Sequence, residues 1–185
     1  MAHASILHPE QTVLAVVDYQ EAFRGFIDQF EAVTPAIINI IRGFSVLGLP
    51  VLVTEQYPKG LGHTIAEVIE VLPELTPVIE KTAFSSCGAD PFEEHLRAAG
   101  AKQVLICGIE THICVSQTAH DLLDKGYQVH ILTDAVGSRF PVNKEAGLEK
   151  MIASGAIPSS VEMALFELMR DSKHSCFRDI QAIIR

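Results

Sequence analysis

The chain has 185 residues, 48% of them hydrophobic, and its 14 basic and 23 acidic side chains give a formal charge of −9. A chain of this length and hydrophobicity buries enough apolar surface to offset its ordering entropy, which excludes global disorder and predicts a single domain over residues 1–185. The acidic balance, without a run of Lys or Arg, argues against nucleic acid as a partner and favours a small-molecule substrate.

The N-terminal segment and the uncharged stretches predict a cytoplasmic protein that does not enter a membrane. Residues 1–11 carry histidines, a proline and a glutamate where a secretory signal has basic residues followed by an apolar run. The longest stretches without charge, residues 32–41 and 44–54, are shorter than the roughly 18 residues that span a bilayer.

Apolar segments rich in Val and Ile alternate with segments of helical periodicity. Short runs of this composition are typical of strands buried on both faces of a parallel sheet. In chain order we expect a strand at 12–17, a helix at 34–48, strands at 50–54 and 76–80, a helix at 90–100, a strand at 103–107, a helix at 111–125, a strand at 128–133, a helix at 143–154, a short strand near 156–158, and helices at 160–170 and 175–184.

Two helix starts carry local signals. Thr34 stands before Pro35, which predicts an N-cap followed by a proline at the first helical position. Asp90 repeats this arrangement before a second proline, and Glu93 completes a capping box.

The alternation of strands and helices predicts right-handed βαβ units. The expected fold is therefore α/β and Rossmann-like, with three αβα layers around a doubly wound, mainly parallel six-stranded sheet. In such sheets ligands bind beyond the carboxyl ends of the strands, so the residues at those ends are the candidate site.

Three reactive side chains follow predicted strands. Asp18 follows the first strand and Lys81 the third, while Cys114 falls in the first turn of the helix after the fourth. The unpaired amides and positive dipole end of a helix start favour thiolate over thiol. A cysteine nucleophile needs a base and a cation, so the three fit one site. Taken singly, each also fits a structural role: a turn residue, a solvated lysine or a packed cysteine.

The remaining cysteines and the nearby histidine are given structural roles. Cys87, Cys107 and Cys176 form no CxxC pair, and we read them as thiols, with Cys107 buried in the core. His112 is two residues from Cys114, and positions two apart on a helix do not share a face. Residues 133–135 are expected to form a loop.

These residues resemble the isochorismatase-like cysteine hydrolases, the superfamily that includes nicotinamidases and N-carbamoylsarcosine amidohydrolase. The motifs that carry the resemblance are Gly108 to Val115, Val17 to Gln20 and Glu80 to Ser85, in that family's order. Residues 54–62 and 164–168 look most like the isochorismatase-domain-containing subgroup.

The resemblance implies the site's roles and part of its geometry. Cys114 would be the nucleophile, Asp18 the base and Lys81 the partner that stabilises charge. The strand order would be 3-2-1-4-5-6, and the peptide between Ile109 and Glu110 would be cis. The backbone amides of Glu110 and Cys114 would form the oxyanion hole.

Two departures from the family narrow the chemistry. Nicotinamidases carry an Asp-x-His metal motif after the second strand, where this chain has Glu55, Gln56 and Tyr57, with His63 as the one nearby imidazole. We therefore predict no metal and, without a glycine-rich nucleotide motif, no cofactor. True isochorismatases lack a cysteine at the position of Cys114, which points away from vinyl-ether cleavage.

The sequence thus favours a metal-independent cysteine hydrolase of a small amide or related C–N bond, acting through an acyl-thioester. Phe23, Gln56, Tyr57 and Phe84 are the expected pocket residues. The alternative is a homo-oligomeric binding or assembly module of the same fold with a vestigial triad. A homo-oligomer is expected in either case.

Overall fold

The computed structural model describes residue 3 and residues 5–185, so residues 1, 2 and 4 of the N-terminal segment interpreted above lie outside the described residues. The described residues form one six-stranded sheet in which every pair of neighbours is parallel and the order is β3-β2-β1-β4-β5-β6. This confirms the predicted fold class and strand order. The strands are β1 (Thr12–Val17), β2 (Val51–Gln56), β3 (Val78–Lys81), β4 (Gln103–Ile109), β5 (Gln128–Gly137) and β6 (Ile157–Ser159).

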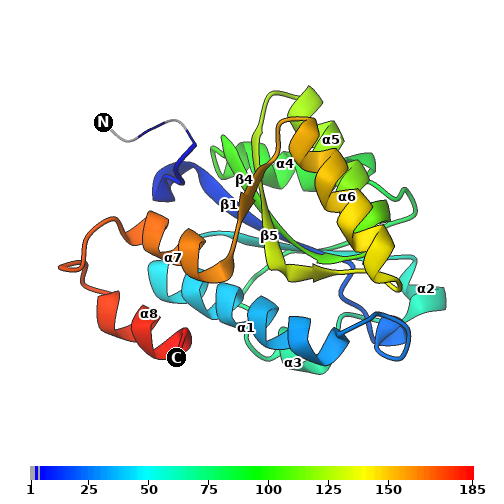
Figure 1. Cartoon of the computed structure of the whole chain (residues 1–185), viewed down its shortest axis with the longest axis horizontal. Coiled ribbons are helices and arrows are strands. Elements are labelled where there is room, and N and C mark those ends of the chain that lie inside the picture. The colour runs from blue at the N-terminus through cyan, green and yellow to red at the C-terminus, as the bar shows by residue number, and fades with distance from the viewer. Residues whose placement is uncertain (1–2, 4) are drawn as a thin grey trace.

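Helices cover both faces of the sheet, as Figure 1 shows. One layer contains α1 (Phe30–Leu47), α3 (Ala66–Ile69), α7 (Val161–Met169) and α8 (Phe177–Ile183), and the other contains α4 (Asp90–Ala98), α5 (Ser116–Asp124) and α6 (Pro141–Ala153). A short helix, α2 (Pro58–Leu61), follows β2.

The sequence of the central strand β1 is a continuous apolar run because both faces of this strand are buried. All six of its residues are buried. Leu14 and Val16 pack into the core beneath α1 and α7, whereas Val13, Ala15 and Val17 pack into the core beneath α4 and α5. A strand buried on both faces has no polar side, which is why its sequence does not alternate.

Helix α1 packs as a core element. Of the described helices, it is the one whose length and composition would also suit a membrane span, and 44% of it is buried inside the protein. Its buried residues include Ile37, Ile41 and Phe44, which recur at helical spacing and therefore share one face.

The predicted start of this helix is wrong. Helix α1 begins at Phe30, and Pro35 lies inside it. Thr34 does not cap the helix, because its hydroxyl donates back to the carbonyl of Phe30 at 2.9 Å. Burial of Phe30 and Val33 extends the apolar face upstream, so packing outweighs the local proline signal.

The capping box at α4 is also absent. Asp90 is the first residue of this helix rather than its cap, and Ala89 takes the cap position without a side-chain hydrogen bond. An acidic side chain in the first turn still interacts favourably with the helix dipole. Phe92 and Leu96 are the buried residues of this helix.

Strand β5 continues through residues 133–135, which the sequence had suggested to be a loop. Ile106 pairs with Ile131 but Gly108 pairs with Val136, so β5 carries an irregularity at this point. Asp134 lies in it, and its carboxylate accepts a hydrogen bond at 3.1 Å from the amide of Val161 at the start of α7. Strand β5 ends at Gly137, close to the candidate active site.

We expect Gly108→Ala to lower the free energy of unfolding by on the order of 3 kcal/mol, measured by urea denaturation. Gly108 has φ +115°, and a Cβ there would lie 2.1 Å from the carbonyl oxygen of Val17. Gly126 is the matched control, because its φ is also positive (+83°) but the space around it is open. If Gly108→Ala and Gly126→Ala lowered the free energy of unfolding equally, the close approach of β1 and β4 at Gly108 would not be what requires glycine there.

Candidate active site

The structure brings together the three side chains singled out at the strand ends. Asp18 directly follows β1, Lys81 is the last residue of β3, and Cys114 follows β4. Lys81 Nζ lies 2.7 Å from Asp18 Oδ2, and both side chains are at most 1% exposed. Asp18 adopts φ +51°, a left-handed conformation uncommon for residues other than glycine.

The Cys114 thiol lies close enough to the Asp18 carboxylate for the two groups to interact electrostatically. Burial, and then the negative charge of Asp18, raise the pKa of Cys114 to about 12, while Lys81 acts in the opposite direction. The expectation that the helix start makes this cysteine a thiolate is therefore wrong for the resting protein. The sulfur is protonated at neutral pH, and a neighbouring carboxylate is placed to take its proton.

Cys114 lies in a π-helical turn, Thr111–Val115, where the sequence predicted an α-helix. The amide of Val115 donates to the carbonyl of Glu110, five residues back, at 3.2 Å. Helix α6 packs tightly here, since a Cβ on Gly147 would lie 3.0 Å from Cα of His112.

The surroundings of this turn agree with two sequence-based expectations. The peptide between Ile109 and Glu110 is cis, as the resemblance implied. The ring of His112 is hydrogen-bonded to Ser138 at 3.1 Å, so its partner is not Cys114. The oxyanion hole from the amides of Glu110 and Cys114 stays a prediction.

Lys81 is held by several acceptors. Besides Asp18, its ammonium donates to Gln56 Oε1 and to the carbonyl of Phe84, both at 2.8 Å, and to the carbonyl of Ala83 at 3.1 Å. Gln56 was expected as a pocket residue, and it both lines the cavity and fixes the lysine. These acceptors together hold the Lys81 ammonium in one position beside Asp18.

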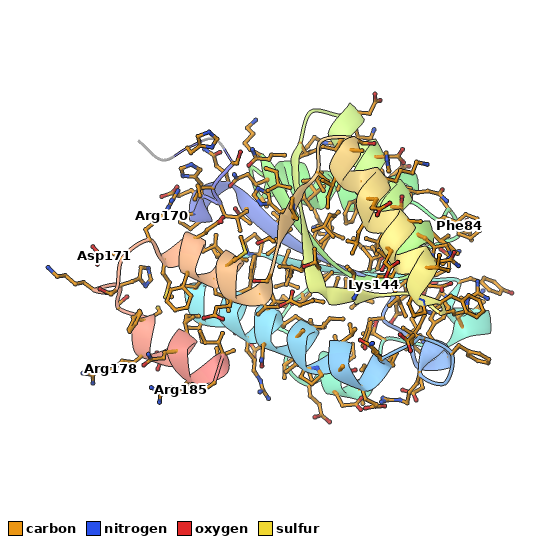
Figure 2. The ribbon with its side chains drawn as sticks, in the orientation of Figure 1. Phe84, Lys144, Arg170, Asp171, Arg178 and Arg185 are labelled. Atoms are coloured by element: carbon orange, nitrogen blue, oxygen red, sulfur yellow. The ribbon has the colours of Figure 1, made fainter. Side chains whose placement is uncertain are left out.

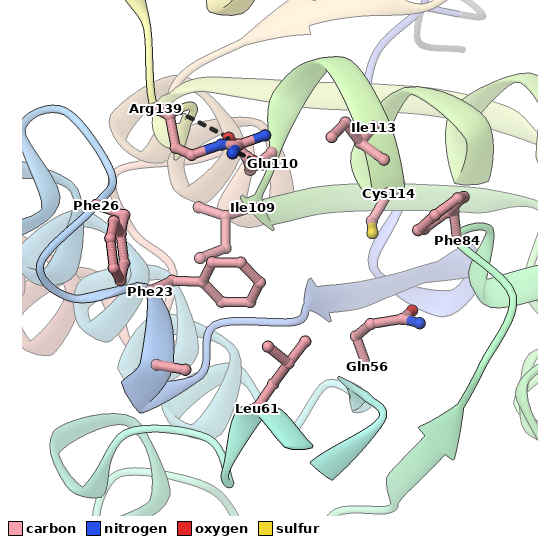
Figure 3. Close-up of a pocket in the computed structure, with 11 residues that line it drawn as sticks. Phe23, Phe26, Gln56, Leu61, Phe84, Ile109, Glu110, Ile113, Cys114 and Arg139 are labelled. Atoms are coloured by element: carbon pink, nitrogen blue, oxygen red, sulfur yellow. Dashed lines mark hydrogen bonds and ion pairs between the residues drawn. The ribbon is translucent and has the colours of Figure 1, made fainter. Parts of the chain in front are cut away.

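A cavity of about 430 Å³ opens beside Cys114. Figure 3 shows the sulfur directed into it, between Phe84 and Gln56. Its walls are mostly apolar, and the residues that line it are Ala22, Phe23, Phe26, Gln56, Leu61, Phe84, Ile109, Glu110, Ile113, Cys114 and Arg139. Of the expected pocket residues, Phe23, Gln56 and Phe84 are among them.

Tyr57 does not line this cavity. Its side chain is 54% exposed, and it lines a separate hollow together with Lys59 and Pro91. Its backbone is left-handed, with φ +38°, at the turn into α2. Leu61, at the end of α2, lines the cavity where Tyr57 was expected to do so.

The sequence interpretation missed an ion pair on the cavity wall. Glu110 is 6% exposed and accepts hydrogen bonds from the backbone amide of Arg139 at 2.9 Å and from its Nε at 3.1 Å. Arg139 could have been identified as a site residue from its position just after β5. It was missed because the strand was predicted to end at residue 133 rather than at Gly137.

The end of β2 and the residues that follow it do not fit a metal site. Glu55 is buried and its Oε1 accepts hydrogen bonds from the amide and hydroxyl of Thr64 at 2.7 and 2.8 Å. Its Oε2 is bonded to His63 Nδ1 at 2.9 Å. In the described part of the chain, no three His, Cys, Asp or Glu side chains are grouped so as to hold a metal ion. One imidazole and one carboxylate, already paired, do not provide the ligands of a zinc or iron site.

Comparisons with known proteins agree with this geometry. Residues 12–163 match the isochorismatase domain. The secreted isochorismatase effector Isc1 of Phytophthora sojae is 41% identical over 97% of this chain and 87% of its own, and isochorismatase domain-containing protein 2 of Danio rerio is 37% identical over 100% and 92%. Among solved structures, the MAR1 ribonuclease of Caenorhabditis elegans has a TM-score of 0.93 and 38% identity over 97% and 92% of the two chains. The pyrazinamidase of Pyrococcus horikoshii in complex with zinc has a TM-score of 0.72 and 27% identity over 81% and 99%.

Proposed function

The chain belongs to the isochorismatase family, in the subgroup of isochorismatase domain-containing proteins, and on that premise we propose that it is a metal-independent cysteine hydrolase of small amides or related C–N bonds. Family membership and relatives named as hydrolases support a hydrolase in general. The observation that carries the finer proposal is the burial of the Cys114 thiol beside Asp18, which is itself paired with Lys81 at 2.7 Å.

The proposed reaction has two halves. Asp18 accepts the thiol proton as Sγ of Cys114 attacks the carbonyl carbon, and the amides of Glu110 and Cys114 stabilise the oxyanion. Asp18 then gives the proton to the leaving nitrogen, the C–N bond breaks, and an acyl-thioester remains. A water molecule gives a proton to Asp18 and attacks the thioester, the acid leaves, and Cys114 regains its proton.

Lys81 supports both halves without exchanging a proton. Its ammonium lies between the Asp18 carboxylate and the fixed oxygens of Gln56 and Phe84. The positive charge stabilises the thiolate while the proton resides on Asp18.

The cavity favours an uncharged, apolar acyl group. Phe23, Phe26, Leu61 and Phe84 contribute apolar walls, and about 430 Å³ accommodates a small molecule. The charged residue pairs at the site, Asp18 with Lys81 and Glu110 with Arg139, are internally neutralised.

An RNA substrate, suggested by the name of the C. elegans protein, fits this site less well. Of the described lining residues, Arg139 is the one cation, and Glu110 already pairs with it. Figure 2 places Arg170, Arg178 and Arg185 at the far end of the long axis from Phe84. Phosphate backbones are bound by clustered, accessible cations, which this cavity does not offer.

The proposal is tested by incubating the purified protein with primary amides that carry aliphatic or aromatic acyl groups, nicotinamide among them, and measuring released ammonia. Parallel samples receive a mixed-sequence RNA oligonucleotide and an activated phosphodiester. We expect ammonia from apolar amides, unchanged by a chelator, and intact RNA. Cleavage of RNA without amide hydrolysis would overturn the proposal.

The cellular location and assembly stay predictions. The relative from P. sojae is named as secreted, so the cytoplasmic assignment rests on the sequence interpretation alone. The small-molecule substrate and the homo-oligomer are likewise proposed here. Size-exclusion chromatography with light scattering would determine the assembly.

A further inference from the structure

Thr54, a buried residue of β2, is connected twice to the base. Its hydroxyl donates to Asp18 Oδ1 at 2.8 Å, and its carbonyl accepts from the Asp18 amide at 3.0 Å. Its side chain is fully buried, and its Cα is in register with Val17, the residue before Asp18. The backbone pairing of β1 with β2 therefore places the Thr54 hydroxyl against the Asp18 carboxylate.

The two oxygens of the Asp18 carboxylate have different donors. Oδ1 accepts from the neutral hydroxyl of Thr54, and Oδ2 accepts from the ammonium of Lys81. The other titratable groups near this carboxylate are the Cys114 thiol and, beyond it, Glu110, which is paired with Arg139. Thr54 is therefore a donor that orients the carboxylate without adding charge.

A hydrogen bond to each oxygen fixes the plane of a carboxylate, because rotation about the Cβ–Cγ bond would break both. A donor to the charged form also makes that carboxylate a weaker base. Thr54 combines both effects at the one group that must take a proton from Cys114 and return it to the leaving nitrogen.

We infer that Thr54 is a positioning residue for the reaction: its hydroxyl aims the Asp18 carboxylate at Cys114 and sets how readily that carboxylate takes the thiol proton. The inference rests on the proposed function for its role in turnover. The contact itself acts on the reactivity of Cys114 whatever the substrate is.

The test compares the pH profiles of wild type and Thr54→Val, which removes the hydroxyl at nearly constant volume. Two rates are measured: kcat/KM for an amide, and alkylation of Cys114 by iodoacetamide, followed by peptide mass spectrometry. We expect the acid limb of both profiles to move up by about one pH unit, since one hydrogen bond to a charged group is lost. We also expect kcat to fall about tenfold with KM unchanged, and Thr54→Ser to restore both.

Thr12→Val is the matched control. Thr12 is buried at the opposite end of β1, and its hydroxyl donates to the carbonyl of His8 at 2.8 Å and to Gln103 at 3.0 Å. This variant loses a buried hydroxyl, as Thr54→Val does, and should lose stability without moving either pH profile. Thr54→Ala is the second variant if Thr54→Val does not fold.

An acid limb that stays in place when the Thr54 hydroxyl is removed, or that moves equally in Thr12→Val, would overturn the inference. The alkylation arm needs no substrate. A shifted alkylation profile in a protein that hydrolyses no amide would therefore refute the proposed function while supporting the role of Thr54.

Discussion

Replacing Cys114 with alanine should reduce amide hydrolysis by at least about 10³-fold and leave the fold intact. In the proposed mechanism the sulfur of Cys114 forms the acyl bond, and neither the Asp18 carboxylate nor the backbone donors take over that role. Cys114 is small and 7% exposed, so removing its sulfur leaves only a small cavity. Steady-state ammonia release and a urea melt together measure the two effects.

Cys176→Ala is the control for this variant. Cys176 lies before α8, and its sulfur contacts the carbonyl of Val46 in α1 rather than the cavity. Hydrolysis at the wild-type rate is expected there. Undiminished turnover in Cys114→Ala would show that Cys114 is not the nucleophile.

The second large effect is expected from Lys81→Met. This change leaves the Asp18 carboxylate buried with Thr54 as its remaining hydroxyl donor. Breaking a buried ion pair from one side costs about 3–5 kcal/mol, because the other charge stays uncompensated. We expect that loss in the free energy of unfolding, and amide hydrolysis below detection.

The double variant Asp18→Asn/Lys81→Met separates stability from catalysis. With both charges removed, no uncompensated ion is buried, so a large part of the lost stability should return. Activity should stay absent, since the base is gone. Additive losses in the free energy of unfolding would show that the 2.7 Å contact is not energetically coupled.

Much of the architecture was predictable from local sequence, because buried parallel strands leave a strong signal. The apolar run of β1 is buried on both faces, and the helical spacing of Ile37, Ile41 and Phe44 matches the buried face of α1. The same logic placed Asp18 and Lys81 at strand ends that lie together.

Features that depend on tertiary contacts were not predictable. The polar residues within β5 resemble a strand end, yet Asp134 is satisfied by the amide of Val161, and the strand runs on to Gly137. Arg139 was missed for that reason.

The environment of the nucleophile was equally hidden. The π-helical turn around Cys114 packs against Gly147 of α6, which lies far away in sequence. The dipole of a helix start would by itself favour the thiolate, whereas burial and the charge of Asp18 raise the pKa of this thiol. Such effects appear when segments distant in the chain meet.

Whether Cys114 carries the acyl group is tested by acid quenching during turnover of an amide, followed by peptide mass spectrometry. We predict an acyl adduct on the peptide that contains Cys114, lost when turnover is allowed to finish before quenching and absent from Cys114→Ala. Turnover with an acyl group on a different residue, and none on Cys114, would contradict the proposed thioester mechanism.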